Sequence, residues 1–183
     1  MTTVLFLISV TCASALLLLS VISLVAPKFQ FWPPPHPNSW QRQAFLWVFR
    51  GMFYSLIGLT VFELINQPTT LSALQLWIGV PILSAGFGAA LASTFDLGWG
   101  LAFGEGQGLK TTGWFSWSRN PIYVVTWVGM IGWGLFAMSG PVSIVLVLWA
   151  IIYLNLVFLE ERWLLATYGK EYADYMSKVP RFM

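Results

Sequence analysis

The chain has 183 residues, of which 57% are hydrophobic, 17% aromatic and only 9% charged, with a formal net charge of +2. Soluble domains carry roughly a quarter charged residues, so this composition excludes a water-soluble globule, a disordered chain and, with one cysteine, a disulfide-rich scaffold. The small net charge gives no basic face for nucleic acid. The sequence therefore predicts an all-α polytopic membrane protein surrounded by a lipid bilayer.

Apolar stretches predict about five transmembrane helices within a single membrane domain, residues 1–183. The stretches cover residues 4–26, 44–65, 72–94, 122–139 and 142–159. The first is too long for a signal peptide, so we expect it to be a span. A tight turn at Ser139-Gly140-Pro141 makes the last two spans a helical hairpin. The tail beyond the hairpin predicts a further helix along the cytoplasmic surface.

The Lys and Arg residues orient the predicted spans. They occur in the first and third connections and after the fifth span, whereas the second and fourth connections carry none. Arg50 lies about two turns inside the second span, on the same side. The positive-inside rule then predicts an external N-terminus and a cytoplasmic C-terminus. Any chemistry is expected on the cytoplasmic side, in residues 95–121 and 160–183.

A glycine-rich segment precedes the fourth span, over residues 95–123. Glycine lets the backbone approach a ligand closely, but a flexible loop explains the same composition. A phosphate-binding loop is not indicated, because the Gly-Lys-Thr adjacency is missing. A dinucleotide fingerprint would need a preceding parallel strand, and none is predicted.

Two polar clusters stand at the cytoplasmic ends of the hairpin helices. The run Arg119-Asn120-Pro121-Ile122-Tyr123 fits a helix start, with Asn120 as N-cap and Pro121 in the first turn. Glu160-Glu161 fits a hydrated helix exit. The short turn between the two helices, however, should bring both clusters together beside the glycine-rich segment. We expect the resulting cation, amide, phenol and carboxylates to hold a zwitterionic, polyhydroxylated ligand.

The remaining polar residues suggest structural roles. His36 is the only histidine and lies far from the polar clusters in sequence, so no metal site is predicted. Glu63, near the outer end of the second span, is interpreted as a hydrogen-bonded structural acid, with a functional role as the alternative. The tail tyrosines Tyr168, Tyr172 and Tyr175 are expected to pack at the membrane interface, where they could also form one wall of the site.

The spaced motifs together resemble those of the integral-membrane methyltransferases, which include isoprenylcysteine carboxyl methyltransferases and phospholipid methyltransferases. The resemblance covers roughly residues 95–183, and residues 1–94 are similar only in being hydrophobic. Its motifs are Thr112-Gly113, Arg119-Asn120-Pro121-Ile122-Tyr123, Glu160-Glu161, Tyr168-Gly169-Lys170-Glu171-Tyr172, Tyr175 and Val179-Pro180.

The resemblance implies S-adenosylmethionine as methyl donor, S-adenosylhomocysteine as product and a lipid-like or small hydrophobic acceptor. Residues 95–183 would be the donor-binding catalytic half, following three N-terminal spans in residues 1–94. Tyr123 and Arg119 are the implied catalytic residues, with Arg119 and Glu161 also as supports. The implied donor-binding residues are Gln107, Gly108, Leu109, Lys110, Phe115, Asn120, Pro121, Ile122, Tyr123, Glu160 and Glu161.

Two residues depart from the carboxyl methyltransferase pattern. Asn120 replaces a common His, and Leu156 stands where those enzymes carry an Arg for the acceptor carboxylate. Leucine cannot pair with a carboxylate, so an amine, a thiol or a less charged lipid group is the expected acceptor. The alternative function is a non-enzymatic scaffold or small transporter subunit, although a transporter should place polar residues mid-membrane on several helices.

Overall fold

The computed structural model describes residues 1–183 except 27, 67–69 and 103–107. All regular structure in the described residues is helical, which confirms the predicted all-α class. The helices are α1 (Thr2–Val25), α2 (Trp40–Ile65), the π-helix η1 (Gln75–Gly79), α3 (Val80–Leu97), α4 (Trp99–Ala102), the 3-10 helix η2 (Gly113–Ser116), α5 (Pro121–Ala137), α6 (Gly140–Tyr168) and α7 (Lys170–Met176).

Four helical stretches of the described chain are long and apolar enough to cross a membrane: α1, α2, η1 with α3, and α6. The fourth predicted span, residues 122–139, corresponds to α5, an apolar helix of only 17 residues. At 1.5 Å per residue it is about 26 Å long, slightly shorter than the hydrocarbon core of a typical bilayer. The protein is thus a polytopic helical membrane protein.

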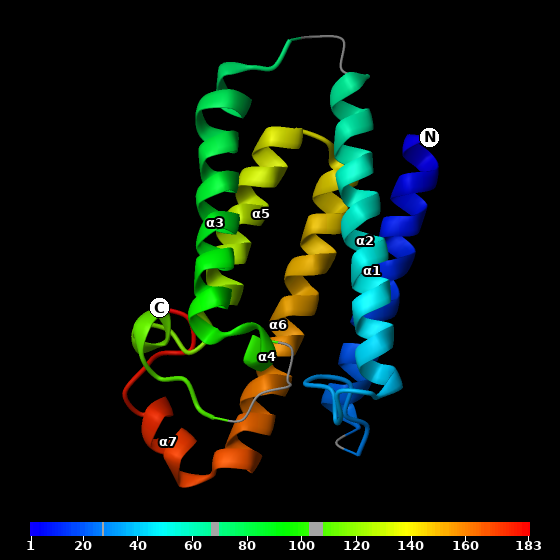
Figure 1. Ribbon diagram of the computed structural model, residues 1–183. Coiled ribbons are helices and arrows are strands. Elements are labelled where there is room, and N and C mark those ends of the chain that lie inside the picture. Colours follow the sequence, from blue (N-terminus) through cyan, green and yellow to red (C-terminus); the bar gives the residue numbers. More distant parts are fainter. Residues whose placement is uncertain (27, 67–69, 103–107) are drawn as a thin grey trace.

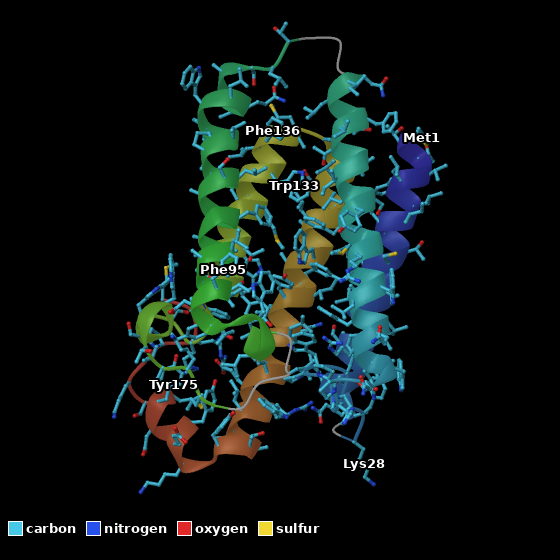
Figure 2. All side chains as sticks on the ribbon, in the orientation of Figure 1. Met1, Lys28, Phe95, Trp133, Phe136 and Tyr175 are labelled. Carbon is cyan, nitrogen blue, oxygen red and sulfur yellow. The ribbon has the colours of Figure 1, made fainter. Side chains whose placement is uncertain are left out.

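The chain passes up and down the bundle, so that alternate connections lie at opposite ends (Figure 1). One end holds the α1–α2 connection, the α3–α5 connection, α7 and the C-terminus, and we call it the basic end because the Lys and Arg of the connections and the tail lie there. Met1 and Lys28 are at opposite ends of the bundle in Figure 2. Away from the basic end, Ser139 Oγ donates to Glu63 Oε2 at 2.9 Å, which confirms Glu63 as a hydrogen-bonded acid.

Two helix pairs form the sides of the bundle, with α6 between them (Figure 1). On one side α1 packs along α2 and α6; on the other α3 packs along α5. The α3–α5 contact is made backbone to backbone, because side-chain carbons added at Gly86 or Gly132 would overlap the main chain of the facing helix. Small residues at such crossings let membrane helices approach closely.

An aromatic cluster fills the space between the two sides. The Trp149 ring lies 5.4 Å from Phe49 of α2 and 6.1 Å from Phe87 of α3. Trp133 of α5 stands perpendicular to Phe53 at 6.0 Å, and Figure 2 shows it pointing into the bundle. These rings tie α2 to α3, α5 and α6 above the basic end.

The end of α6 differs from the sequence prediction. The predicted span stops at residue 159, whereas α6 continues to Tyr168 and ends where Gly169 takes a φ of 52°. The chain then turns into α7 instead of continuing as one helix. Tyr172 and Tyr175 of α7 are buried, so the prediction that they pack at the interface is wrong. They pack instead against Leu109 and Leu164.

Candidate active site

A cavity of about 630 Å³ lies among α2, α3, α5 and α6 and extends to the basic end. Its volume is in the range of small-molecule binding sites. Most of the predicted site residues line it, namely Gly108, Leu109, Lys110, Phe115, Arg119, Asn120, Pro121, Ile122, Tyr123 and Glu160. Glu161 is not among the lining residues, and Gln107 lies outside the described part of the chain.

The predicted meeting of the two hairpin helix ends is confirmed. The Tyr123 hydroxyl at the start of α5 donates to Glu160 Oε2 on α6 at 2.8 Å. The Tyr123 ring also stands perpendicular to Tyr153, at 4.9 Å between centroids. Tyr153, Leu156 and Glu160 are spaced at about one helical turn, so they line the same face of α6 toward the cavity.

The neighbouring carboxylate, Glu161, is held by a separate network. Arg119 Nε lies 3.1 Å from Glu161 Oε1, and Arg181 Nε lies 2.9 Å from Oε2. Asn120 Nδ2 donates to Oε1 at 3.0 Å. The Glu161 residue is only 6% exposed, and burying a carboxylate is tolerated only with such charge pairing and hydrogen bonding.

The same network fastens the C-terminal tail. One Arg119 terminal nitrogen donates to the carbonyls of Met176 and Val179, at 3.1 and 3.0 Å. The Arg119 backbone N–H donates to the carbonyl of Pro180 at 3.0 Å. Asn120 and Ser118 both donate to the carbonyl of Arg181. Residues 176–181 are therefore held against the start of α5.

Tyrosines and an acid hold residues 108–115 of the glycine-rich segment. The Gly108 N–H donates to the Tyr168 hydroxyl at 3.0 Å, and the Tyr175 hydroxyl donates to the Phe115 carbonyl at 2.6 Å. Burial raises the pKa of Tyr175 to about 12, which keeps its phenol protonated as a donor. Asp96, at the end of α3, pairs with Lys110 at 3.1 Å and accepts from the Trp114 N–H.

Several residues of this site were missed by sequence reasoning. Asp96 gave no signal beyond being an acid at a span end. Trp32 and Pro33 of the α1–α2 connection also line the cavity, as do side chains of α2 and α3. These contributions come from residues 1–94, where no motif marks them, and they depend on helix packing that a single sequence does not reveal.

The buried Tyr172 hydroxyl faces the cavity and has no hydrogen-bond partner in the described part of the chain, whereas the indole of Trp32 lies beside Tyr123 and Glu160 and that of Trp149 beside Tyr153. Buried polar groups are normally paired. Burial also raises the pKa of Tyr172 well above its usual value, so this phenol remains a donor. The Tyr172 phenol thus offers a hydrogen-bond donor to a ligand in the cavity. Among the described residues, no three His, Cys, Asp or Glu side chains gather in a way that would hold a metal ion.

Two curated proteins are similar to part of this chain. The nickel-cobalt-cadmium resistance protein NccN of Alcaligenes xylosoxydans xylosoxydans is 29% identical over 109 residues, which are 58% of this chain and 51% of NccN. The cobalt-zinc-cadmium resistance protein CzcN of Cupriavidus metallidurans is 32% identical over 111 residues, 58% of this chain and 50% of CzcN. The chain therefore spans about half the length of these relatives. No solved structure matches it.

The family comparison covers the part of the chain that forms the site. Residues 74–171 match the phospholipid methyltransferase family. This range is more than half of the 183 residues and includes the cavity-lining segment 108–110, the start of α5 and Glu160. The chain therefore belongs to the phospholipid methyltransferase family, within the integral-membrane methyltransferase superfamily that its motifs resemble.

Proposed function

We propose that this protein transfers a methyl group from S-adenosylmethionine to a hydrophobic or lipid-like acceptor at the basic end, which faces the cytoplasm. The observation that carries the proposal is a single cavity with two kinds of wall. Its basic end is polar and formed by residues 108–110, the start of α5 and the end of α6, whereas α2 and α3 contribute mostly apolar side chains. One cavity can thus hold a polar donor against an apolar acceptor.

The residues at the basic end fit the proposed donor, which carries ribose hydroxyls, an amino-acid group and a sulfonium. Glu160 supplies a carboxylate oriented by Tyr123. The Tyr172 hydroxyl is buried, faces the cavity and has no partner in the described chain. The backbone at Leu109 offers amide groups, and the adjacent Gly108, whose N–H is bonded to the Tyr168 hydroxyl, has no side chain in the way. Glu160 and this backbone would hold the donor, and Tyr172 would donate to it.

The main contribution of the protein to methyl transfer is to position the acceptor relative to the methyl group of the donor. When bound, the sulfonium supplies a methyl group that is already activated for a one-step displacement. Phe115 and Tyr123 present aromatic faces, which favour a cation by cation–π attraction. Holding the acceptor in line with the methyl carbon converts a bimolecular encounter into a unimolecular step. The surrounding aromatic walls exclude water.

The acceptor would enter from the side of the bundle. Tyr54 of α2 and Leu91 of α3 both line the cavity, yet they are 66% and 50% exposed on the bundle surface. The cavity therefore opens between α2 and α3, within the membrane-spanning part of these helices. Leu156 is buried in its wall, so this wall favours an apolar group. In this proposal residues 95–183 bind the donor and residues 1–94 contact the acceptor within one membrane domain.

The relatives NccN and CzcN are named for resistance to metals, and we do not extend that role to this chain. The cavity supports methyl transfer through its acid–phenol pair and its apolar side opening. A scaffold or transporter subunit would need neither. Ligand binding separates these alternatives, because a scaffold has no reason to bind a nucleoside sulfonium or its product.

Isothermal titration of purified protein with S-adenosylhomocysteine tests the proposal. We expect saturable binding to the wild type and its loss in Glu160→Ala, because the carboxylate that grips the donor is removed. Glu63→Gln is the matched control: it neutralises a hydrogen-bonded acid away from the basic end and should keep the wild-type affinity. Absence of binding to the wild type, or equal binding to wild type and Glu160→Ala, would contradict the assignment.

A further inference from the structure

Residues 177–183, the C-terminal tail, follow α7 and turn back onto the hairpin formed by α5 and α6 (Figure 1). The Phe182 ring lies 5.4 Å from Trp127 of α5. The Arg181 guanidinium lies 4.8 Å from the ring of Phe158 of α6. None of these four residues is among those that line the cavity. The tail therefore contacts both arms of the hairpin outside the cavity.

Arg181 also bonds to both arms through polar groups. Its Nε lies 2.9 Å from Oε2 of Glu161 on α6. Its carbonyl accepts from Asn120 Nδ2 at 3.1 Å and from Ser118 Oγ at 3.2 Å, directly before α5. Glu161 is buried, and charge-assisted hydrogen bonds to a buried carboxylate are among the stronger ones in proteins. One residue of the tail thus connects the start of α5 to the end of α6.

The two arms need such a connection at the basic end. The turn at residues 139–141 joins them only at the other end, and from there α5 packs along α3 whereas α6 packs along α1. The arms thus belong to different parts of the bundle, and both border the cavity. At the basic end, the hydrogen bond from Tyr123 to Glu160 joins them inside the cavity, and the Arg181 contacts join them outside it.

The tail contacts are made next to the two residues of this internal hydrogen bond. Glu161 directly follows Glu160, and Asn120 precedes Tyr123 by three residues, or about one helical turn. A displacement of either helix end would therefore move the Tyr123 hydroxyl relative to the Glu160 carboxylate. Their separation is 2.8 Å, and a hydrogen bond weakens steeply once it is misaligned.

We propose that Arg181 and Phe182 are positioning residues of the donor site, which hold Tyr123 and Glu160 in the geometry that binds the donor without touching it themselves. The inference rests on the proposed function. It gives a role in ligand binding to residues that follow position 171, where the match to the family ends.

The test measures the affinity of purified protein for S-adenosylhomocysteine by isothermal titration, at a temperature well below the unfolding midpoint of every variant. Arg181→Gln should bind about tenfold more weakly than the wild type, because its ion pair with Glu161 is lost. Arg181→Lys should recover part of this loss, and Phe182→Ala should weaken binding severalfold. Lys178→Gln is the matched control, because it removes one positive charge from an exposed residue of the same tail and should keep the wild-type affinity.

A double-mutant cycle distinguishes positioning from a merely structural role. Tyr123→Phe removes the hydroxyl that bonds to Glu160, and Arg181→Gln is then added to it. If Arg181 acts through this hydrogen bond, Arg181→Gln should weaken binding by only about twofold or less in the Tyr123→Phe protein. An equal loss of affinity in both backgrounds would overturn the proposal, because independent sites have additive effects.

Stability and binding are read separately. An Arg181→Gln protein with a lower unfolding midpoint and unchanged affinity would show that the tail only stabilises the fold, and would overturn the proposal. If Arg181→Gln does not fold, Phe182→Ala decides in the same way, because it leaves the partners of Glu161 in place. If the wild type does not bind S-adenosylhomocysteine, the methyltransferase proposal itself fails. If the wild type binds it and the tail variants bind equally well, only the positioning role is wrong.

Discussion

Adjacent carboxylates at the end of α6 have opposite surroundings. Glu160 lines the cavity and accepts a hydrogen bond from the Tyr123 phenol. Glu161 points about 100° further around the helix, where Arg119, Arg181 and Asn120 occupy its oxygens. The resemblance to membrane methyltransferases implied donor contacts for both acids. The structure gives Glu161 the partners of a positioning residue, which fixes the tail and the start of α5.

Neutralising Glu161 distinguishes a positioning role from direct contact with the methyl donor. In Glu161→Gln the buried Arg119 loses its counter-charge, and breaking a buried ion pair from one side costs about 3–5 kcal/mol. We expect a much lower thermal unfolding midpoint in detergent and faster proteolysis of the residues after Met176. Glu160→Gln, by contrast, should leave the midpoint nearly unchanged. A Glu161→Gln protein of wild-type stability that has lost S-adenosylhomocysteine binding would instead show direct contact with the donor.

At the scale of single residues, the sequence allowed the hairpin-end cluster to be predicted. The short turn at residues 139–141 determines that Tyr123 and Glu160 become neighbours, and hydrogen bonds confirm this. Trp32 and Asp96 could not be found in the same way. Trp32 lies beside Glu160, although more than one hundred residues separate them in the sequence. This proximity depends on how the helices pack, and an apolar sequence does not distinguish a helix surface that faces lipid from one that faces another helix.

Among the helices, the crossing of α3 and α5 depends on absent side chains. A side-chain carbon at Gly132 would overlap the backbone at Leu83, and one at Gly86 would overlap Gly129. The apolar pattern predicted both spans but not their close approach, because glycine in a hydrophobic stretch is read equally as a flexible point. The pattern also misplaced the end of α6, since a helix continues beyond the membrane where its residues become polar.

Substituting one of these glycines should separate α3 from α5. Gly132→Ala forces a backbone shift in a well-packed contact, and such overpacking costs about 1–3 kcal/mol. The expected result is a lower thermal unfolding midpoint in detergent. Gly88→Ala, on the facing helix α3, has open space around the new carbon and should be neutral or slightly stabilising. Equal effects of the two substitutions would show that helix propensity, and not the crossing, determines the outcome.

For the whole molecule, the placement of charge predicts its orientation. The connections and the tail at the basic end carry the Lys and Arg, whereas the connection between α5 and α6 carries none. In a Cys12→Ser background, an impermeant maleimide should label Thr70→Cys in intact cells and Ser177→Cys only after lysis, because both positions are exposed at opposite ends. Labelling of Ser177→Cys in intact cells would reverse the proposed orientation.

The side opening at Tyr54 and Leu91 means that the two proposed substrates arrive from different phases. The effective concentration of a donor dissolved in water is its molar concentration. The effective concentration of an amphiphile that diffuses within the leaflet is its mole fraction among the lipids. Turnover would then follow the mole fraction of acceptor in the bilayer and fall when inert lipid dilutes it, even at constant total amount. The width of the α2–α3 opening, and not solubility in the cytosol, would set which molecules the protein encounters.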